Sequence, residues 1–531
     1  MFNRTSLQAI AALASISLLA GCGLLPGGGS DAEQKIIVGS TSVPSTLDPA
    51  ASWDGSWELF RNVFQTLLSF PTGSTTPQPD AAKKCEFTDA SNKTFQCMLR
   101  EGLKFSDGER LDAEAVKHSI DRIVKIDVKA GPKGLLGSLD RVETEGESTV
   151  TFHLNKADAT FPFVLATPAM SIVAPKEYPA DRLREDDRVT GSGPYVLKSY
   201  DPDSSAELAA NHDYKGFAKR RNEAVTIRYF KESGALMQAL EAQQIDLTYR
   251  GLTAEEVLAI EDRQGKEKEG ETKLQLIETV GSEIRFLVFN PKDPAAGNPA
   301  VRKAVAQVID RDALVAKAYM GTAEPLYSMI PKGVAGHTTP FFDSFGSPSA
   351  EKAGQILREA GINEPVALTL WYTTDRYGSS TKPEFEEIRR QLEDSKLFKV
   401  TLKSRPTWKE YTKGFQQGEF PVFGRGWNPD FPDPDNFIAP FVGKENAVGT
   451  PYEQREILDE LLPKSRRQPD RGAVSDQFHT AQKIIAKDVR LLPLWQGKTY
   501  IAASDEIAGG ERALDPQTVM QMWELHRKTS W

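Results

Sequence analysis

Residues 99–116 of the chain read LREGLKFSDGERLDAEAV. The alternating pattern from Phe95 to Phe105 predicts a β-strand, and Ser106–Gly108 is typical of a tight turn. Asp112 is a suitable N-cap for a following helix. The apolar residues of that helix recur on one face: Val116, Ile120 and Ile123. A strand, a turn and an amphipathic helix in succession indicate a mixed α/β protein.

Strand and helix patterns also alternate along the rest of the chain. The whole chain of 531 residues has 39% hydrophobic residues, 26% charged residues and a net charge of −9. A chain of this length is too long for a single hydrophobic core, which predicts two or three domains. No basic patch stands out, which argues against a nucleic-acid partner. Strands are predicted at 35–39, 149–154, 225–230, 245–249, 284–290, 366–372 and 491–495. Helices are predicted at 57–68, 233–240, 299–308, 349–361, 385–392 and 481–485.

The N-terminus has the form of a secretory signal, because Arg4 precedes an apolar run, 7–19, that is short for a membrane span. The run ends in Leu19-Ala20-Gly21-Cys22, which resembles the bacterial lipobox. We therefore expect a signal peptide at 1–21, a lipid on Cys22 and a Gly/Ser-rich flexible tether at 22–30. The alternative is a signal peptide with a chance cysteine. The body would lie outside the cytoplasm, anchored to the cell membrane by the lipid alone.

Two further cysteines, Cys85 and Cys97, remain once Cys22 is lipidated. Outside the cytosol, two cysteines twelve residues apart are most simply a disulfide. Residues 89–93 between them are turn formers, so a strand–turn–strand clip is expected. No histidine is near in sequence, and we expect no metal site here.

A second distinctive stretch, residues 426–437, reads GWNPDFPDPDNF. Its three prolines exclude a helix interior or a central strand and predict a rigid loop. Aromatic faces and carboxylates on a rigid loop can hold a small cationic or amide-rich ligand. Asp, Asn and Pro are also ordinary residues of a solvated surface turn. The aromatic side chains indicate that the loop packs against another part of the molecule.

Motifs for catalysis are missing from the sequence. None of the six histidines forms an H-x-x-x-H pair, and there is no G-x-S-x-G elbow or Walker loop. Residues 349–352 match S-x-x-K, but S-D-N and K-T-G partners are lacking and helix capping by Ser349 explains the match better. We therefore expect no catalytic residues, no cofactor, no metal and no enzymatic activity.

With Ser119, Ile120 and Arg122, the stretch 99–116 closely resembles the signature of the extracellular solute-binding family 5. These are the oligopeptide- and dipeptide-binding proteins of ABC importers. Blocks spread over nearly all of the mature chain agree in the same order: 47–49, 191–195, 211–214, 245–247, 301–304, 309–311, 357–361 and 492–494.

This resemblance implies an α/β, two-lobed periplasmic-binding-protein-like fold (type II, cluster C) with an additional domain inserted in lobe one. Lobe one would comprise residues 31–70, 190–280 and 490–531, the inserted domain 71–189 and lobe two 281–489. Chain crossings would form a hinge, and the ligand would be enclosed between the lobes. Gly191 and Gly193 would serve backbone geometry at a domain crossing.

The resemblance also implies ligand-binding residues. In peptide-binding members, an aspartate three residues after a tryptophan in the late loop pairs with the ligand's α-ammonium, and Trp427 and Asp430 match that spacing. The two later aspartates of the loop keep the solvated-turn interpretation. Trp53 stands where some peptide binders place a polar or acidic contact, a departure from plain oligopeptide chemistry. Tyr452 lies near a family position that faces the cleft.

The expected function is reversible capture of a peptide-like solute by a monomer that delivers it to the permease subunits of an ABC importer. One alternative is the same role for a non-peptide solute, such as a sugar, an opine or a metal chelate. Another is an enzyme or a surface adhesion protein built on the same fold.

Overall fold

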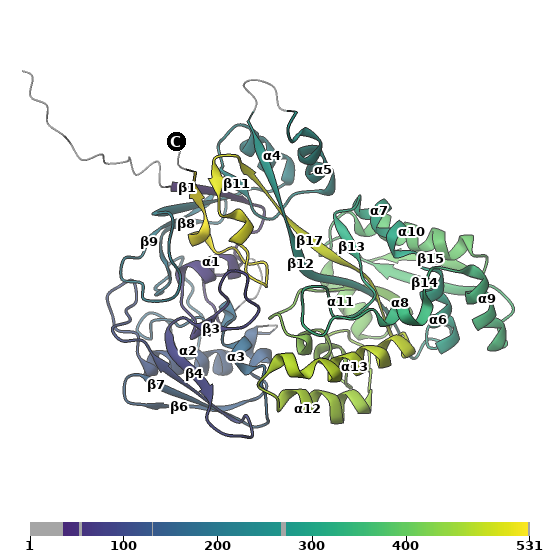
Figure 1. Ribbon diagram of the computed structural model, residues 1–531, viewed down its shortest axis with the longest axis horizontal. Coiled ribbons are helices and arrows are strands. Elements are labelled where there is room, and N and C mark those ends of the chain that lie inside the picture. Colours follow the sequence, from purple (N-terminus) through teal and green to yellow (C-terminus); the bar gives the residue numbers. More distant parts are fainter. Residues whose placement is uncertain (1–34, 52–55, 130, 267–271, 529–531) are drawn as a thin grey trace, which may run out of the picture.

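One large mixed sheet runs through both lobes of the molecule (Figure 1). The computed structural model describes residues 35–51, 56–129, 131–266 and 272–528. The strand order of the sheet is β15-β14-β16-β12-β17-β11-β1-β10-β9-β8, and β13 pairs with β17 beside this path. The predicted α/β, two-lobed fold is confirmed.

Two long strands connect the lobes, β12 (Leu274–Phe289) and β17 (Leu491–Ser504). They pair antiparallel over most of their length, with a register shift between Val280 and Ile284. In Figure 1 they cross the middle of the molecule side by side, from the α4–α5 end to the second lobe. This strand pair, with its irregularity in the middle, lies where the hinge is expected.

Lobe one builds its half of the sheet around β1, which pairs parallel with β10 and β11, while β9 and β8 extend the sheet antiparallel. Helices α4 and α5 pack against this half through Leu236, Leu240 and Ile260. The elements are β1 (Lys35–Ser40), α1 (Ser56–Val63), β2 (Leu68–Ser69), β8 (Tyr195–Asp201), β9 (Ser205–Ala210), β10 (Ala224–Tyr229), α4 (Ser233–Glu241), β11 (Leu247–Thr248), α5 (Ala254–Arg263), β18 (Ile507–Ala508) and β19 (His526–Arg527).

Lobe two has its own buried core and its own half of the sheet, in which β14 pairs parallel with β15 and β16. The elements are α6 (Pro299–Val308), α7 (Arg311–Tyr319), β13 (Ala323–Pro325), α8 (Pro340–Phe345), α9 (Ala350–Glu359), β14 (Val366–Tyr372), α10 (Thr381–Asp394), β15 (Phe398–Ser404), α11 (Trp408–Gln416), β16 (Val422–Trp427), α12 (Leu462–Arg466) and α13 (Ser475–Asp488).

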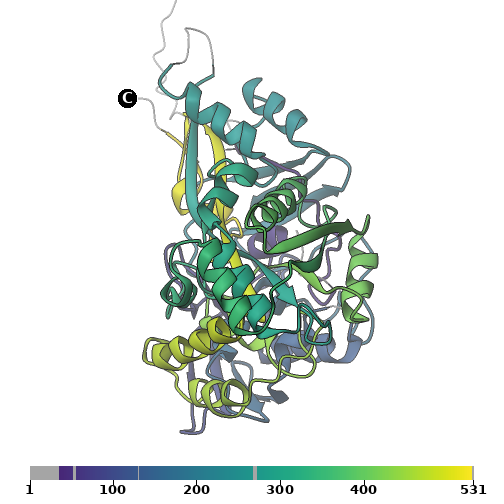
Figure 2. The ribbon, with the colours of Figure 1, turned by 90° about the vertical axis from the view of Figure 1, so that its right-hand side faces the viewer.

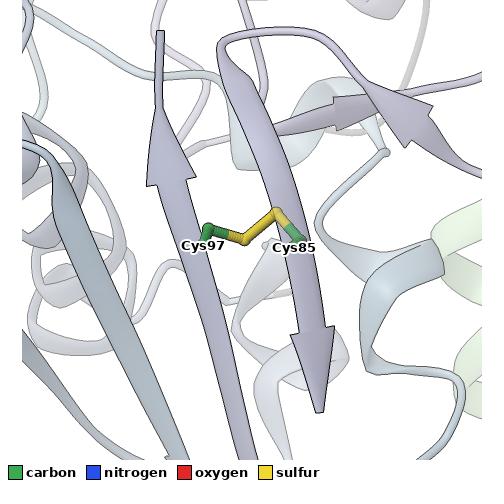
Figure 3. Close-up of a disulfide and its surroundings, with 2 residues drawn as sticks. All are labelled: Cys85 and Cys97. Carbon is green, nitrogen blue, oxygen red and sulfur yellow. A yellow bond between two sulfur atoms is a disulfide. The ribbon is translucent and has the colours of Figure 1, made fainter. Parts of the chain in front are cut away.

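A separate four-stranded sheet, in the order β4-β5-β7-β6, forms the additional domain beside lobe one. Asp112 caps α2 as predicted, its side chain accepting a hydrogen bond from the Ala115 amide. The predicted disulfide is confirmed, because Cys85 and Cys97 are bonded across β4 and β5 (Figure 3). The elements are β3 (Gln78–Pro79), β4 (Ala82–Phe87), β5 (Thr94–Leu99), α2 (Ala113–Ile126), β6 (Leu139–Glu145), β7 (Thr149–Leu154) and α3 (Phe161–Val164).

The additional domain and lobe two meet opposite the hinge. The Ala159 amide donates to the Arg466 carbonyl over 2.8 Å, and Asn92 Nδ2 donates to the Arg467 carbonyl over 2.8 Å. Figure 2 shows the α12–α13 region against the additional domain at the lower end of the molecule. The additional domain and lobe two are therefore in direct contact in this structure.

Several predicted elements have different limits. Helix α1 stops at Val63, because Leu68 and Ser69 pair with β3 instead. Strand β5 ends at Leu99 rather than Phe105. Gly191 and Gly193 approach the end of α1 closely, and a Cβ on Gly191 would lie 2.1 Å from the Val63 carbonyl oxygen. That supports a backbone role for these glycines. The domain boundaries expected from the sequence stay a prediction.

Within the described ranges, no helix is both long and apolar enough to cross a bilayer. The expected signal peptide, Cys22 and the whole of the expected tether, 22–30, precede Lys35 and so lie outside the described residues.

Candidate ligand-binding site

The loop after β16 leads from lobe two to the core of lobe one and the additional domain. Trp427 ends β16 and faces Ile284 of β12 in the sheet. Four residues later, Phe431 is 4% exposed and belongs to the core shared by lobe one and the additional domain. Its ring centroid lies 6.0 Å from that of Phe163 in α3. The loop is therefore an interlobe contact, and the solvated-turn interpretation is wrong.

One asparagine holds the predicted site residues together. Asn436 Oδ1 accepts hydrogen bonds from the Asp430 amide at 2.9 Å and from Trp427 Nε1 at 3.2 Å. Asn436 Nδ2 donates to Asp430 Oδ2 at 2.9 Å. The structure thus brings Trp427 and Asp430 together, as their spacing suggested. Asn436 was missed in the sequence, although its place in the same rigid loop was a usable signal.

The three aspartates of the loop differ in their partners. Asp433 receives two hydrogen bonds from Arg471, at 2.7 and 2.9 Å. Asp435 receives two from Arg466, at 2.8 and 2.9 Å. Both carboxylates are buried and structural, which corrects the solvated interpretation given to them. Across the described part of the chain, Asp430 is the member of this trio without a basic partner.

Asp430 is partly buried, and burial raises the pKa of its carboxyl group to about 6, against the lowering effect of the Asn436 hydrogen bond. A partly desolvated carboxylate that has hydrogen-bond donors but no neighbouring cation favours an incoming positive charge. The arrangement can therefore bind an ammonium or another small cation without chemical change.

A polar cavity of about 200 Å³ lies beside this loop, at the register shift between β12 and β17. Both lobes and the hinge contribute to its wall, with Asn428 from the loop. The lining residues are Arg250, Gly251, Leu252, Gly281, Ser282, Glu283, Asn428, Gly497, Lys498, Thr499, Tyr500 and Thr518. Because most of these side chains are polar or charged, the cavity suits a polar solute better than an apolar one.

Backbone strain gathers at the same cavity. Arg250 has φ +60°, Thr518 has φ +62° and Gly251 has φ +103°. Positive φ is unfavourable for a β-branched residue such as threonine, and such conformations persist where surrounding contacts fix them. Arg250 supplies those contacts, since its Nη2 donates to Thr518 Oγ1 at 3.0 Å and its Nε to Glu58 at 2.9 Å. Strained backbone at an interlobe cavity is typical of binding sites.

One other predicted ligand contact, Tyr452, is not brought to Asp430. Tyr452 is 4% exposed inside lobe two, where its hydroxyl donates to Asp488 at 3.2 Å and Arg490 lies over its ring. This places Tyr452 in the core rather than beside Trp427. Trp53 falls within residues 52–55, outside the described residues. No trio of His, Cys, Asp or Glu side chains in the described ranges could hold a metal ion.

The chain is similar to known proteins over most of its length. A probable D,D-dipeptide-binding periplasmic protein of Escherichia coli (strain K12) is 26% identical over 506 residues, which cover 90% of this chain and 91% of the relative.

Solved structures share the fold. A periplasmic binding protein of Helicobacter pylori in complex with the peptide STSA has a TM-score of 0.74 at 22% identity, covering 93% of this chain and 98% of its own. The binding protein AgaA of A. tumefaciens R10, in complex with agropinic acid, has a TM-score of 0.73 at 22% identity, covering 94% and 99%.

The family model described as bacterial extracellular solute-binding proteins, family 5, matches residues 76–449, which is more than half of the chain. This match and the two-lobed fold agree with the resemblance read from the sequence. The chain therefore belongs to family 5 of the bacterial extracellular solute-binding proteins.

Proposed function

We propose that this protein captures a short peptide between its two lobes and delivers it to the permease subunits of an ABC importer. The observation that carries the proposal is the carboxylate of Asp430, which is partly buried, oriented by Asn436 and unpaired with any cation in the described part of the chain. The names of the curated relatives, several of them dipeptide- or tripeptide-binding proteins, support the same solute class.

In this proposal the α-ammonium of the peptide pairs with Asp430, and Trp427 covers it from the loop. Main-chain groups of the peptide would hydrogen-bond to the protein as an added strand, and water in the neighbouring cavity would tolerate varied side chains. Closure about β12 and β17 encloses the solute, and the closed form docks on the permease. No bond in the solute is made or broken.

The cellular setting is part of the proposal. The lipobox resemblance supports a lipid on Cys22 that ties a monomeric body to the outer side of the cell membrane. The disulfide between Cys85 and Cys97 fits an oxidising extracytoplasmic compartment. Lipid attachment would be tested by mass spectrometry of the N-terminal peptide, with Cys22→Ser as the control.

A dipeptide or tripeptide with a free amino terminus is expected to bind, and its N-acetylated form at least about tenfold more weakly, because acetylation removes the charge that pairs with Asp430. Isothermal titration calorimetry at pH 7 with matched free and acetylated peptides measures this difference. The proposal fails if no peptide in a broad set binds, or if acetylation leaves the affinity unchanged.

A non-peptide solute remains the second candidate, because the structural neighbour AgaA was solved with agropinic acid. Mass spectrometry of solute retained by the purified protein separates the two classes. A retained peptide supports the first, and a retained opine, sugar or metal chelate supports the second.

Peptide binding is expected to weaken about tenfold between pH 7 and pH 5. The raised pKa of Asp430, about 6, means that below it the carboxyl group is mostly protonated and uncharged, while the peptide's α-ammonium stays charged over this range. Calorimetry at the two pH values tests this. The acetylated peptide should show a smaller change, which controls for Asp80, whose pKa burial also raises to about 6. Equal affinities at both pH values would contradict the role of Asp430.

A further inference from the structure

A strained turn near the C-terminus, residues 515–519, faces the site loop from lobe one. Asp515 Oδ1 accepts from the amides of Gln517 and Val519, both at 2.9 Å. The φ of +62° at Thr518 is held by Tyr249, whose hydroxyl donates to the Thr518 carbonyl at 2.6 Å. Because several contacts fix an unfavourable backbone, the position of Gln517 is closely determined.

The side chain of Gln517 links the core of lobe one to the loop of lobe two. Its Oε1 accepts a hydrogen bond from Arg61 Nη2 at 3.2 Å, and its Nε2 donates to the main-chain carbonyl oxygen of Asp430. An arginine can only donate, so Arg61 fixes the orientation of the amide and turns its N–H group toward Asp430.

Arg61 is itself rigidly placed. It donates to Ser69 Oγ and to the Ala166 carbonyl, each at 2.9 Å, and forms an ion pair with Asp515 at 3.3 Å. Gln517 is 7% exposed and lies on this buried base. The donor that meets Asp430 is therefore preorganised before the lobes close.

Asp430 is consequently held from both sides of the hinge: lobe two binds its amide and carboxylate through Asn436, and lobe one binds its carbonyl through Gln517. We propose that Gln517 is a positioning residue that couples lobe closure to the orientation of the Asp430 carboxylate. This inference rests on the proposed function.

Coupling of this kind works in both directions. When the lobes separate, the bond from Gln517 is lost and Asp430 keeps Asn436 alone. Closure restores the bond and fixes the carboxylate toward the ammonium, so a bound ammonium in turn stabilises the closed form. Gln517 acts through Asp430 and needs no contact with the solute.

Gln517→Met tests the coupling, because methionine has a similar length but cannot donate. The matched control is Gln521→Met: Gln521 is also buried, but it bonds to Phe70 and Thr72 rather than to lobe two. Gln517→Met is expected to lower the affinity for a free-amine peptide about three- to tenfold, as for one lost hydrogen bond, and to raise the rate at which the peptide dissociates. The affinity of Gln517→Met for the acetylated peptide should differ less than twofold from that of wild type. Gln521→Met should leave the ratio of the affinities for the free and the acetylated peptide unchanged.

The outcomes separate the inference from the proposed function. Equal losses for free and acetylated peptides, or the same ratio change in Gln521→Met, would overturn the positioning role. If wild-type protein binds no peptide, the proposed function fails. Small-angle scattering of the solute-free proteins then tests by itself whether Gln517 stabilises contact between the lobes. A larger radius of gyration for Gln517→Met than for wild type and Gln521→Met supports it, and three equal radii overturn it.

Discussion

Asp430→Asn is expected to weaken binding of a free-amine peptide by about 30- to 1,000-fold. Removing one partner of a desolvated charge pair costs about 2–4 kcal/mol, and each 1.4 kcal/mol is about tenfold in affinity. Asparagine keeps the size of the side chain and can still accept a hydrogen bond from Asn436, which now bonds Asp430 Oδ2. The loss should therefore reflect charge rather than a collapsed loop.

Calorimetry of wild type and Asp430→Asn with the free and the acetylated peptide measures this loss of affinity. The acetylated peptide, which lacks the charge, should bind Asp430→Asn and wild type within about threefold of each other. A control with the same change in the same loop is Asp435→Asn, which removes the ion pair with Arg466. This variant should lower the free energy of unfolding and affect the affinity for the peptide less than Asp430→Asn does. If Asp430→Asn binds the free peptide as tightly as wild type, the ammonium lies elsewhere.

The sequence predicted the local parts of this site better than the contacts that complete it. Trp427 and Asp430 are three residues apart on a proline-rigid loop, so their proximity follows from spacing. Gln517 lies 87 residues from Asp430, and no periodicity or turn rule connects them. A contact between two lobes depends on how they close, which a single sequence does not encode in any local pattern.

The same limit applies to the fold. Asp112, α2 and the Cys85–Cys97 clip were predictable because capping, helical spacing and cysteine separation are local signals. The hinge strands were predicted too short: β12 begins at Leu274, ten residues before the predicted strand. Its first half, with Glu278, Thr279 and Gly281, lacks the apolar run of a buried strand, and pairing with β17 keeps it extended.

Asp48→Ala is expected to lower the free energy of unfolding by about 3–5 kcal/mol, the cost of leaving a buried charge without its partner. Asp48 and Arg122 are 1% and 2% exposed. They form a two-point ion pair between lobe one and α2, with N–O distances of 2.7 and 2.8 Å. Asp48 also accepts from the amides of Ala50 and Arg184, so alanine leaves those donors unsatisfied as well.

Urea denaturation at pH 7, followed by circular dichroism, measures this change. The comparison is Glu143→Ala, which removes exposed ion pairs with Arg141 and His153 and should leave the free energy of unfolding nearly unchanged. Replacing both buried partners, as Asp48→Leu with Arg122→Met, should recover part of the loss, because no charge is then left buried alone. If Asp48→Ala were as stable as Glu143→Ala, this pair would not hold the additional domain to lobe one, and the apolar core that the two share would have to do so.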